Sequence, residues 1–345
     1  MIVTRTQAFK TINLKLLTLL ATFLVILLHT AAVPFSYFHL AWSVSVTYEV
    51  LGRIAFPLYL LIAGYHSLNK NESLLSTLKK RVMNLVIPLI VWSAIYLFYN
   101  QRINANTQAI SFLELFSKPA YPHLWFIYTL ILLYLVTPLL NTFIQNGSRQ
   151  RINYTLAVWF ALASVYMLFD NVKINLLESQ PIPSPSNIDK VIYLSGFYII
   201  GGVVRRFNIN PKVTISTIIF IISTVLTAVM TYSLSISTFA PNRVFLFYSA
   251  PTLVVVSLSC FFMLLNAEFR WKKWVFNLVR SLSRLSLGIF FVHIIVLETI
   301  LSFLRINFEG YYSALTIPLV ALACFVISAA IVWLLRLIPL LRKIT

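Results

Sequence analysis

The chain has 345 residues, of which 59% are hydrophobic and only 10% are charged, and its mean hydropathy is +0.86. Because a soluble domain carries about 25% charged residues, this composition excludes a soluble globular protein. The net charge of +18 would suggest a nucleic-acid partner in a soluble protein, but its distribution along this chain excludes that interpretation.

Apolar segments long enough to cross a bilayer, about 20 residues each, follow one another with little polar sequence between them. The ten candidates cover roughly 14–34, 50–66, 82–99, 123–144, 152–169, 188–204, 213–235, 244–265, 285–304 and 314–335. We therefore expect an all-α fold. It should be a polytopic bundle of about ten transmembrane helices that forms a single integral-membrane domain over residues 1–345.

The basic residues are divided unevenly between the two sides of this expected bundle. If the N-terminus lies in the cytoplasm, the segments on that side hold 20 of the 27 Lys and Arg residues, and the outer loops, such as 170–187, hold six. This bias predicts cytoplasmic termini in the inner (plasma) membrane of the cell. It also favours contact with anionic lipid and no nucleic acid. Cys260 and Cys324 lie in apolar spans without metal-ligand spacing, so we expect neither a metal nor a disulfide.

The first two spans each carry one ionisable residue. His29 lies about five residues from the outer end of the first span, and Arg53 lies about three residues into the second. Such residues usually face a bundle interior or a water-filled cavity, because charge in lipid is costly. The pair suits a general base beside a cation that stabilises negative charge. It equally suits a histidine bonded to a helix carbonyl and an arginine that reaches the headgroups.

Basic and aromatic residues flank the next two spans. Lys80 and Arg81 precede the third span at the inner face, where they suit either the phosphates of a nucleotide-like molecule or simple anchoring of the topology. His123, Trp125 and Tyr128 open the fourth span at the outer face. Their aromatic rings suit either stacking on a sugar or the usual interfacial belt.

The last third of the chain adds one interfacial segment and two ionisable residues. Tryptophans and basic residues in 266–284 predict an interfacial helix. His293 and Glu298 lie in the ninth span. Because an unpaired buried charge is strongly destabilising, Glu298 and Arg53 are candidates for an ion pair. The alternative is a protonated Glu298, or one located in the interface.

Five motifs follow one another along the chain. The first is an apolar run that leads to His29, and the second is an Arg-x-x-x-Pro pattern that continues to Ala-Gly-Tyr over Arg53–Tyr65. In the third, basic residues lead to Pro88 and Trp92. The fourth is His-Leu-Trp-Phe-x-Tyr over 123–128, and the fifth is Ser-Leu-Gly-Ile-Phe followed by a histidine over Ser286–His293. In this order, over nearly the whole chain, they resemble the acyltransferase-3 family of integral-membrane O-acyltransferases, which modify surface polysaccharides and related acceptors.

The resemblance implies transfer of an acyl group, most often acetyl, from acyl-coenzyme A to a sugar hydroxyl during polysaccharide modification or exopolysaccharide biosynthesis. It places the catalytic histidine at His29, and Arg53 is expected to stabilise charge on the thioester carbonyl. Acyl-coenzyme A would be a co-substrate, with no bound cofactor. The acceptor would be a polysaccharide or a lipid-linked sugar, and partners in a polysaccharide synthesis or export complex are expected.

The remaining candidate residues are divided between the two substrates. Because acyl-coenzyme A is made in the cytoplasm, we expect the basic residues at that face to bind it. These are Lys15, Lys80 and Arg81. The acceptor or the cavity is assigned to His123, Trp125, Tyr128, His293 and Glu298.

One departure from the family bears on the donor. Family members usually carry an arginine eleven residues before the histidine, a position that is Thr18 here. Lys15 lies one turn earlier, about 4.5 Å away along the axis and about 60° off the same face, and a lysine lacks the bidentate fork of arginine. Two rival interpretations therefore remain. One is a polysaccharide or lipid-linked-sugar transporter, and the other is a non-catalytic subunit of a polymer export complex.

Overall fold

The structure is a computed structural model that describes residues 2–38, 42–69, 74–103, 114–116, 118–166, 168–169, 187–269, 271–306, 308 and 312–345. In these residues the regular structure is entirely helical, so the expected all-α fold is confirmed. The expected outer loop at 170–187 lies outside the described residues except for Asn187, which begins a helix.

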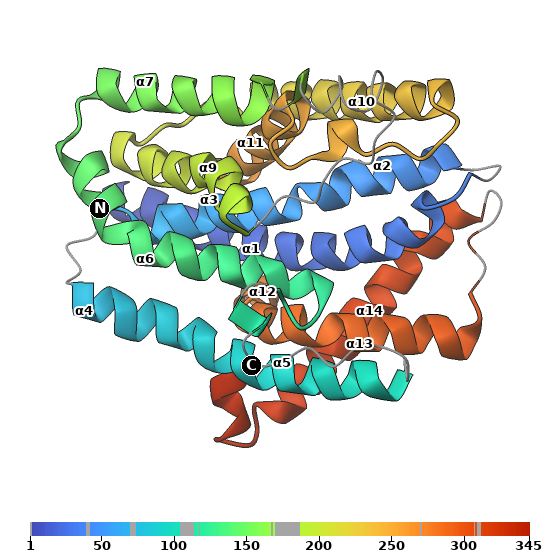
Figure 1. Cartoon of the computed structure of the whole chain (residues 1–345). Helices are drawn as coiled ribbons and strands as arrows, with labels where there is room; N and C mark the ends of the chain where they lie inside the picture. The colour runs from blue at the N-terminus through green and yellow to red at the C-terminus, as the bar shows by residue number, and fades with distance from the viewer. Residues whose placement is uncertain are drawn as a thin grey trace.

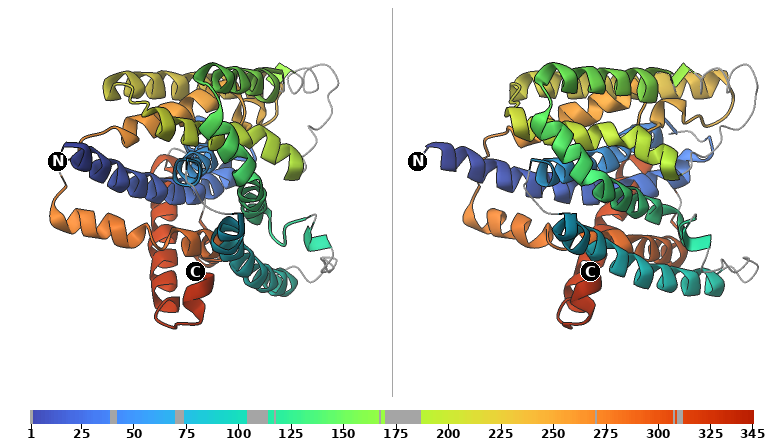
Figure 2. Two further views of the ribbon diagram at one scale, coloured as in Figure 1. Left: turned by 90° about the vertical axis from the view of Figure 1, so that its left-hand side faces the viewer. Right: turned by 60° about the vertical axis from the view of Figure 1, so that its left-hand side comes forward.

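Long helices make up most of the bundle (Figure 1). They are α1 (Ile2–Phe35), α2 (Trp42–Arg53), α3 (Ala55–Ser67), α5 (Met83–Ile103), α6 (Trp125–Asn146), α7 (Arg149–Phe160), α9 (Asn187–Phe207), α10 (Val213–Ser237), α11 (Pro251–Leu265), α13 (Ser286–Leu304) and α14 (Ser313–Leu335). The short pieces are α4 (Leu74–Thr77), η1 (Leu78–Val82), η2 (Glu114–Phe116), η3 (Pro122–Leu124), η4 (Ala161–Tyr166), η6 (Val244–Leu246), α12 (Lys273–Leu282) and η7 (Leu341–Ile344). Helices α1 to α3 lie between α7 and α10 on one side and α5 and α13 on the other (Figures 1 and 2).

Eight helices of the described part are long and apolar enough to cross a membrane. They cover Phe9–Phe35, Trp42–Ser67, Lys79–Arg102, Pro122–Asn146, Val213–Ser237, Val244–Leu265, Ser286–Leu304 and Ser313–Leu335. The chain is therefore a multi-pass membrane protein, and eight of the ten expected spans are confirmed.

The other two expected spans are helical but more polar. The span expected at 152–169 is α7 followed by η4, and α7 begins with Arg149 and Arg151. The span expected at 188–204 is α9, which has only 14 uncharged residues between Lys190 and Arg205. Fourteen helical residues measure about 21 Å, which is less than the roughly 30 Å of a hydrocarbon core.

The second span begins earlier than its expected start at residue 50. Helix α2 starts at Trp42 and packs along α1, and the indole of Trp42 donates to the Phe35 carbonyl (3.0 Å). Polar residues lower the hydropathy of α2, yet Ser45 and Glu49 are fully buried. Arg53 is consequently the last of the 12 residues of α2 rather than the fourth residue of the span.

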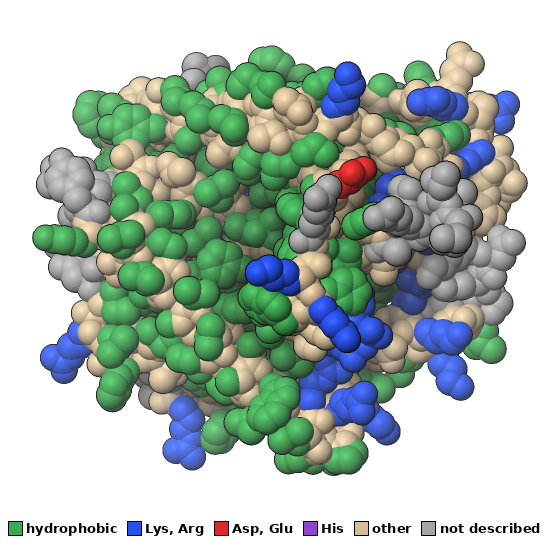
Figure 3. Space-filling model, turned by 180° about the vertical axis from the view of Figure 1, so that it is seen from behind, with side chains coloured by type: hydrophobic (Ala, Val, Ile, Leu, Met, Phe, Trp, Pro, Cys, Tyr) green, Lys and Arg blue, Asp and Glu red, His purple; other side chains and the backbone are tan. Residues whose placement is uncertain are grey.

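One end of the bundle gathers basic side chains from segments far apart in the sequence. Four hydrogen bonds join these segments: Lys10 Nζ to Asn208 Oδ1 (2.8 Å), Asn13 Nδ2 to the Ala267 carbonyl (2.8 Å), Arg205 Nη1 to the Tyr65 carbonyl (3.0 Å) and Arg206 Nη1 to the Gly147 carbonyl (2.8 Å). This basic end contains the starts of α1, α7 and α10 and the ends of α3, α6, α9 and α11. In Figure 3 most Lys and Arg side chains lie toward the right-hand half, beside a broad apolar surface. The basic end contains the segments that the charge bias assigns to the cytoplasm.

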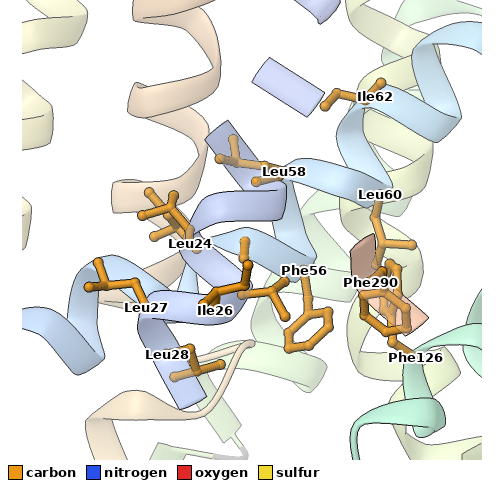
Figure 4. Packing of buried hydrophobic residues seen from close by; sticks show 14 of the residues in the cluster. Leu24, Ile26, Leu27, Leu28, Phe56, Leu58, Leu60, Ile62, Phe126 and Phe290 are labelled. Carbon is orange, nitrogen blue, oxygen red and sulfur yellow. The ribbon is translucent and has the colours of Figure 1, made fainter. Parts of the chain in front are cut away.

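The core follows the middle of α1 through the bundle. Leu17, Ala21 and Val25 are buried there against neighbouring helices. Figure 4 shows leucines of α1 beside those of α3, with the ring of Phe56 turned toward the rings of Phe126 and Phe290. The Phe56 and Phe126 centroids are 4.8 Å apart. Helix α1 is thus packed on several sides, which fixes the position of His29.

The interfacial segment expected at 266–284 is helical over α12, from Lys273 to Leu282. Its ten residues are too few to span a bilayer. Val279 is buried, whereas Trp274 and Leu278 are exposed. This pattern is consistent with the expected interfacial helix.

Candidate active site where α1 crosses α2 and α13

Gly52 lets α2 approach the backbone of α1 directly beside the two predicted catalytic residues. A Cβ atom at Gly52 would lie 2.7 Å from Leu28 Cα, a separation that real side chains do not adopt. Leu28 precedes His29, and Gly52 precedes Arg53, so this contact brings the two functional side chains to the same crossing. They are close enough for their charges to interact.

The Arg-x-x-x-Pro spacing has a physical consequence in the second span. In a continuous helix the amide of residue 57 would donate to the carbonyl of Arg53, and a proline has no amide hydrogen. The helix is interrupted at this position, where Ile54 forms a turn between α2 and α3. Regular helical bonding resumes one residue later, where Leu58 donates to the Ile54 carbonyl (2.9 Å). Pro57 therefore places Arg53 at an interruption of the span.

Arg53 is paired with Glu49, one turn earlier in α2. Its Nε lies 3.1 Å from Glu49 Oε2, and the side chain of Glu49 is fully buried. The second oxygen of Glu49 lies 3.5 Å from Nη2 of Arg243. One carboxylate thus faces two guanidinium groups, which leaves an excess of positive charge.

The expected pairing of Arg53 with Glu298 is wrong. Glu298 accepts hydrogen bonds from Tyr99 (2.9 Å) and Tyr121 (2.5 Å), near the end of α13 that lies away from the basic end. The expectation failed because the second span was expected to start at residue 50, which leaves out Glu49, whereas α2 buries Glu49 beside Arg53.

Three histidines from distant parts of the chain meet at this site. The ring centroids of His29 and His293 are 5.3 Å apart, those of His123 and His293 are 5.2 Å apart, and those of His29 and His123 are 6.4 Å apart. His123 begins the span that contains α6, and His293 lies two turns into α13. His123 and His293 are buried, and His29 is close enough to both His293 and Arg53 for their charges to interact.

The nitrogens of this cluster are largely unused. His293 bonds the Phe290 carbonyl through Nδ1 (2.7 Å), whereas its Nε2 has no partner. Nε2 of His29 and both nitrogens of His123 are also buried without hydrogen bonds. Buried polar groups are nearly always bonded in folded proteins, so three adjacent rings with orphaned nitrogens make this cluster the candidate site. In the described residues, no group of three or more His, Cys, Asp or Glu is placed to hold a metal ion.

A cavity of about 210 Å³ opens beside Arg53. It is lined by Arg53, Trp125, Lys190, Tyr193, Leu194, Phe247, Tyr248 and Ser249. The Arg53 guanidinium lies 5.4 Å from the centre of the Tyr248 ring, and the rings of Trp125 and Tyr248 are 5.5 Å apart. The cavity is smaller than the roughly 300–1,000 Å³ of drug-sized pockets, so its size suits one sugar ring or a short chain.

The predicted acceptor residues divide between the cavity and its surroundings. Trp125 lines the cavity. His123 and His293 lie in the histidine cluster. Tyr128 instead donates to the Leu115 carbonyl (2.7 Å), and Glu298 bonds tyrosines. Sequence reasoning missed Glu49, which directly precedes an expected span, and Tyr248 and Lys190, which lie near the starts of two others without any motif to mark them.

The three predicted donor residues are not gathered into one cluster. Arg81 bonds Ser67 (2.5 Å) and lies over the ring of Tyr134. Lys80, its neighbour in η1, is exposed. Lys15 lies on α1 beside Arg280 and Arg284. The hydroxyl of Thr18 donates to the Leu14 carbonyl (2.8 Å).

The comparisons with known proteins assign this architecture to a family. The model of the acyltransferase domain of the acyltransferase-3 family matches residues 12–337. No curated protein and no solved structure matches the chain. The matched region includes His29, Arg53, His123 and His293. Because the match covers most of the chain, the chain belongs to the acyltransferase-3 family and is a membrane acyltransferase.

Proposed function

We propose that this acyltransferase moves an acetyl group from acetyl-coenzyme A to a hydroxyl of a cell-surface polysaccharide or lipid-linked sugar. The observation that carries the proposal is the buried histidine cluster, with its orphaned nitrogens, next to an arginine that lines an aromatic cavity. In this O-acetyltransferase, His29 is the general base and Arg53 stabilises the charge that develops on the thioester oxygen.

The reaction requires one proton transfer and the exchange of one bond. His29 Nε2 takes the proton of the acceptor hydroxyl as its oxygen attacks the thioester carbon. The carbonyl oxygen gains negative charge, which the Arg53 guanidinium stabilises inside a cavity with little water. The carbon–sulfur bond then breaks, and the thiolate of coenzyme A receives the proton from His29. Arg53 contacts Glu49 through Nε, so its Nη groups are the ones that would donate to the thioester oxygen in the cavity.

The other two histidines position His29 and its proton. Nδ1 of His293 donates to the Phe290 carbonyl (2.7 Å), which leaves Nε2 of His293 as the acceptor nitrogen. An imidazolium formed at His29 therefore has neighbouring rings with nitrogen lone pairs, those of His293 and His123, whose centroids lie 5.3 and 6.4 Å from its own. His123 and His293 thus stabilise the protonated base without contacting the thioester.

The substrates reach the site from opposite sides. His29 lies six residues before Phe35 and 14 residues after Lys15, which corresponds to about 9 Å and about 21 Å of helix. We assign the basic end to the cytoplasm of an inner-membrane protein, with Lys15, Lys80 and Arg81 contacting the phosphates of the donor. Trp125 and Tyr248 stack on the acceptor sugar.

The test follows coenzyme A release. The purified protein is mixed with acetyl-coenzyme A and a thiol probe, with and without acceptor sugars. We expect thiol release that increases with acceptor, and His29→Gln should lower this rate by about 10²–10⁴-fold. His66→Gln, an exposed histidine at the basic end of α3, is the matched control and should retain full activity. A His29→Gln protein that keeps most of the rate would refute the assignment of the base.

A further inference from the structure

A second and larger cavity lies at the basic end, away from the histidine cluster. Its volume is about 610 Å³. It lies between α12, the start of α13 and the end of α14, and its lining residues are Ser281, Leu282, Arg284, Leu285, Phe325, Val326, Ala329, Ala330, Trp333, Arg336, Leu337 and Arg342. Figure 2 shows α14 crossing the direction of α1 steeply, so its final turns project beside α12.

The polar part of this cavity is cationic. Its three charged lining residues are Arg284, Arg336 and Arg342. Arg336 donates through Nη1 to the Arg284 carbonyl, which ties the end of α14 to the turn before α13. In the described part of the chain, no carboxylate forms an ion pair with any of the three. Lys15 lies close enough to Arg280 and Arg284 for their charges to interact, so it adds to the positive field.

Two further features favour an anion at this position. Burial lowers the pKa of Arg336, and the nearby positive charges of Arg342 and Arg284 lower it further. The three cations therefore repel one another and would be stabilised by a bound anion. The first turn of α13 begins after Leu285 without a side-chain cap, so its backbone amides add a partial positive charge beside the arginines.

The rest of the cavity wall is apolar and faces outward. Phe325 and Ala329 form its buried side, whereas Val326, Trp333 and Leu337 are all more than half exposed. A cavity with an apolar wall open to the lipid side and arginines at its basic end matches an amphiphile with a phosphate-bearing head. Among such molecules, those already in the membrane reach this wall without crossing the bundle.

We propose that this cavity binds an anionic phospholipid, with its phosphodiester head on Arg284, Arg336 and Arg342 and one acyl chain along the α14 wall. A lipid bound there bridges α12, α13 and α14. Helix α13 carries His293, so the lipid braces the helix that supports His29. The inference goes beyond acyl transfer, because lipid binding is measured without any substrate.

The test compares lipid retention in variants of matched charge. The full-length protein is delipidated in detergent and titrated with phosphatidylglycerol or phosphatidylcholine, and bound lipid is counted by native mass spectrometry. We expect selective binding of phosphatidylglycerol by the parent and at least about tenfold weaker binding by Arg336→Gln/Arg342→Gln, since each basic residue contributes to anionic-lipid affinity. Arg151→Gln/Lys212→Gln removes the same charge from exposed positions of the basic end and should bind like the parent.

A second variant leaves the three arginines unchanged and alters the apolar wall of the cavity instead. Ala330→Phe fills the apolar wall without changing charge, so it should also lower phosphatidylglycerol binding while the protein stays folded by circular dichroism. Equal binding by Ala330→Phe, the arginine variant and the control would overturn the proposal. Displacement of phosphatidylglycerol from the parent by free coenzyme A at micromolar concentration would also overturn it and would assign the cavity to the phosphates of the donor. Neither result depends on whether the protein transfers acetyl groups.

Discussion

At the scale of single residues, the site is defined by which polar atoms have partners. Glu49 is fully buried and faces both Arg53 and Arg243. The excess positive charge suits a site in which a carbonyl oxygen becomes negative, because a fully neutralised arginine would offer less stabilisation to that oxygen. Glu49 thus holds Arg53 in place without cancelling the field at the cavity.

The Glu49–Arg53 pair makes a prediction about stability. Glu49→Ala should leave two guanidinium groups facing each other in the bundle, and breaking such a pair costs about 3–5 kcal/mol. Arg53→Ala in the same protein should restore part of this loss. Thermal unfolding of the two single variants and the double variant in detergent measures the coupling.

Glu298 supplies the matched control for this cycle. It bonds Tyr99 and Tyr121, so the effects of Glu298→Gln and Arg53→Ala should simply add. Coupling between Arg53 and Glu298, together with additivity between Arg53 and Glu49, would contradict the arrangement seen here.

At the scale of elements, the interrupted second span explains how Arg53 is exposed to the cavity. Pro57 lies four residues after Arg53, so the carbonyl of Arg53 has no amide to accept from, and the chain turns at Ile54. Gly64, later in α3, allows the other close contact of this span, since an added Cβ would overlap the Tyr198 carbonyl of α9. The span is therefore held between α1 and α9, with Arg53 at its interruption.

Pro57→Ala tests this role of the break. Alanine restores the amide donor, and the variant should be at least as stable as the parent in thermal unfolding, because a continuous helix gains a hydrogen bond. Regularising the turn changes the direction of α2 relative to α3 and shifts Arg53, together with its partner Glu49, relative to the cavity, so the rate of coenzyme A release should fall by tenfold or more. Pro318→Ala, within α14, is the control for removing a helix proline. A Pro57→Ala protein with unchanged rate would show that the break does not position Arg53.

The sequence predicted the helices better than it predicted their contacts. Long apolar runs mark α1, α10 and α14 without ambiguity, and the motif pattern places His29 and Arg53 at the site. The start of α2 was missed because Ser45 and Glu49 lower its hydropathy, and their burial against other helices is a tertiary property. The meeting of His123 with His293 also depends on packing between helices far apart in the chain, which no spacing in the sequence encodes.

At the scale of the whole molecule, the uneven distribution of basic residues and the hydrogen bonds between distant segments indicate the same two ends of the bundle. Segments that the charge bias assigns to one side of the membrane are joined by hydrogen bonds at the basic end, such as Lys10 to Asn208 and Arg205 to Tyr65. The opposite end has its own contacts, such as Tyr48 to the Ala314 carbonyl (2.7 Å). The helices therefore alternate in direction, and His29 lies nearer the end opposite the basic residues.

The side of the membrane at which each end lies can be measured on a single helix. Helix α10 has 25 residues and is about 38 Å long, enough to cross the roughly 30 Å of hydrocarbon. Lys212 precedes it at the basic end, and Ala240 follows it at the other end, and both are exposed. The two native cysteines, Cys260 and Cys324, are buried, so the parent protein should react little with a maleimide reagent.

With the basic end in the cytoplasm, a membrane-impermeant maleimide should label Ala240→Cys in intact cells and Lys212→Cys only after permeabilisation. Labelling of the parent protein measures the background. The reverse pattern would place the basic end outside, where acyl-coenzyme A is not made, and would remove the proposed route of the donor while leaving the helix arrangement intact. Labelling of both variants in intact cells would mean that α10 does not separate the two compartments, in contradiction to its length and apolar composition.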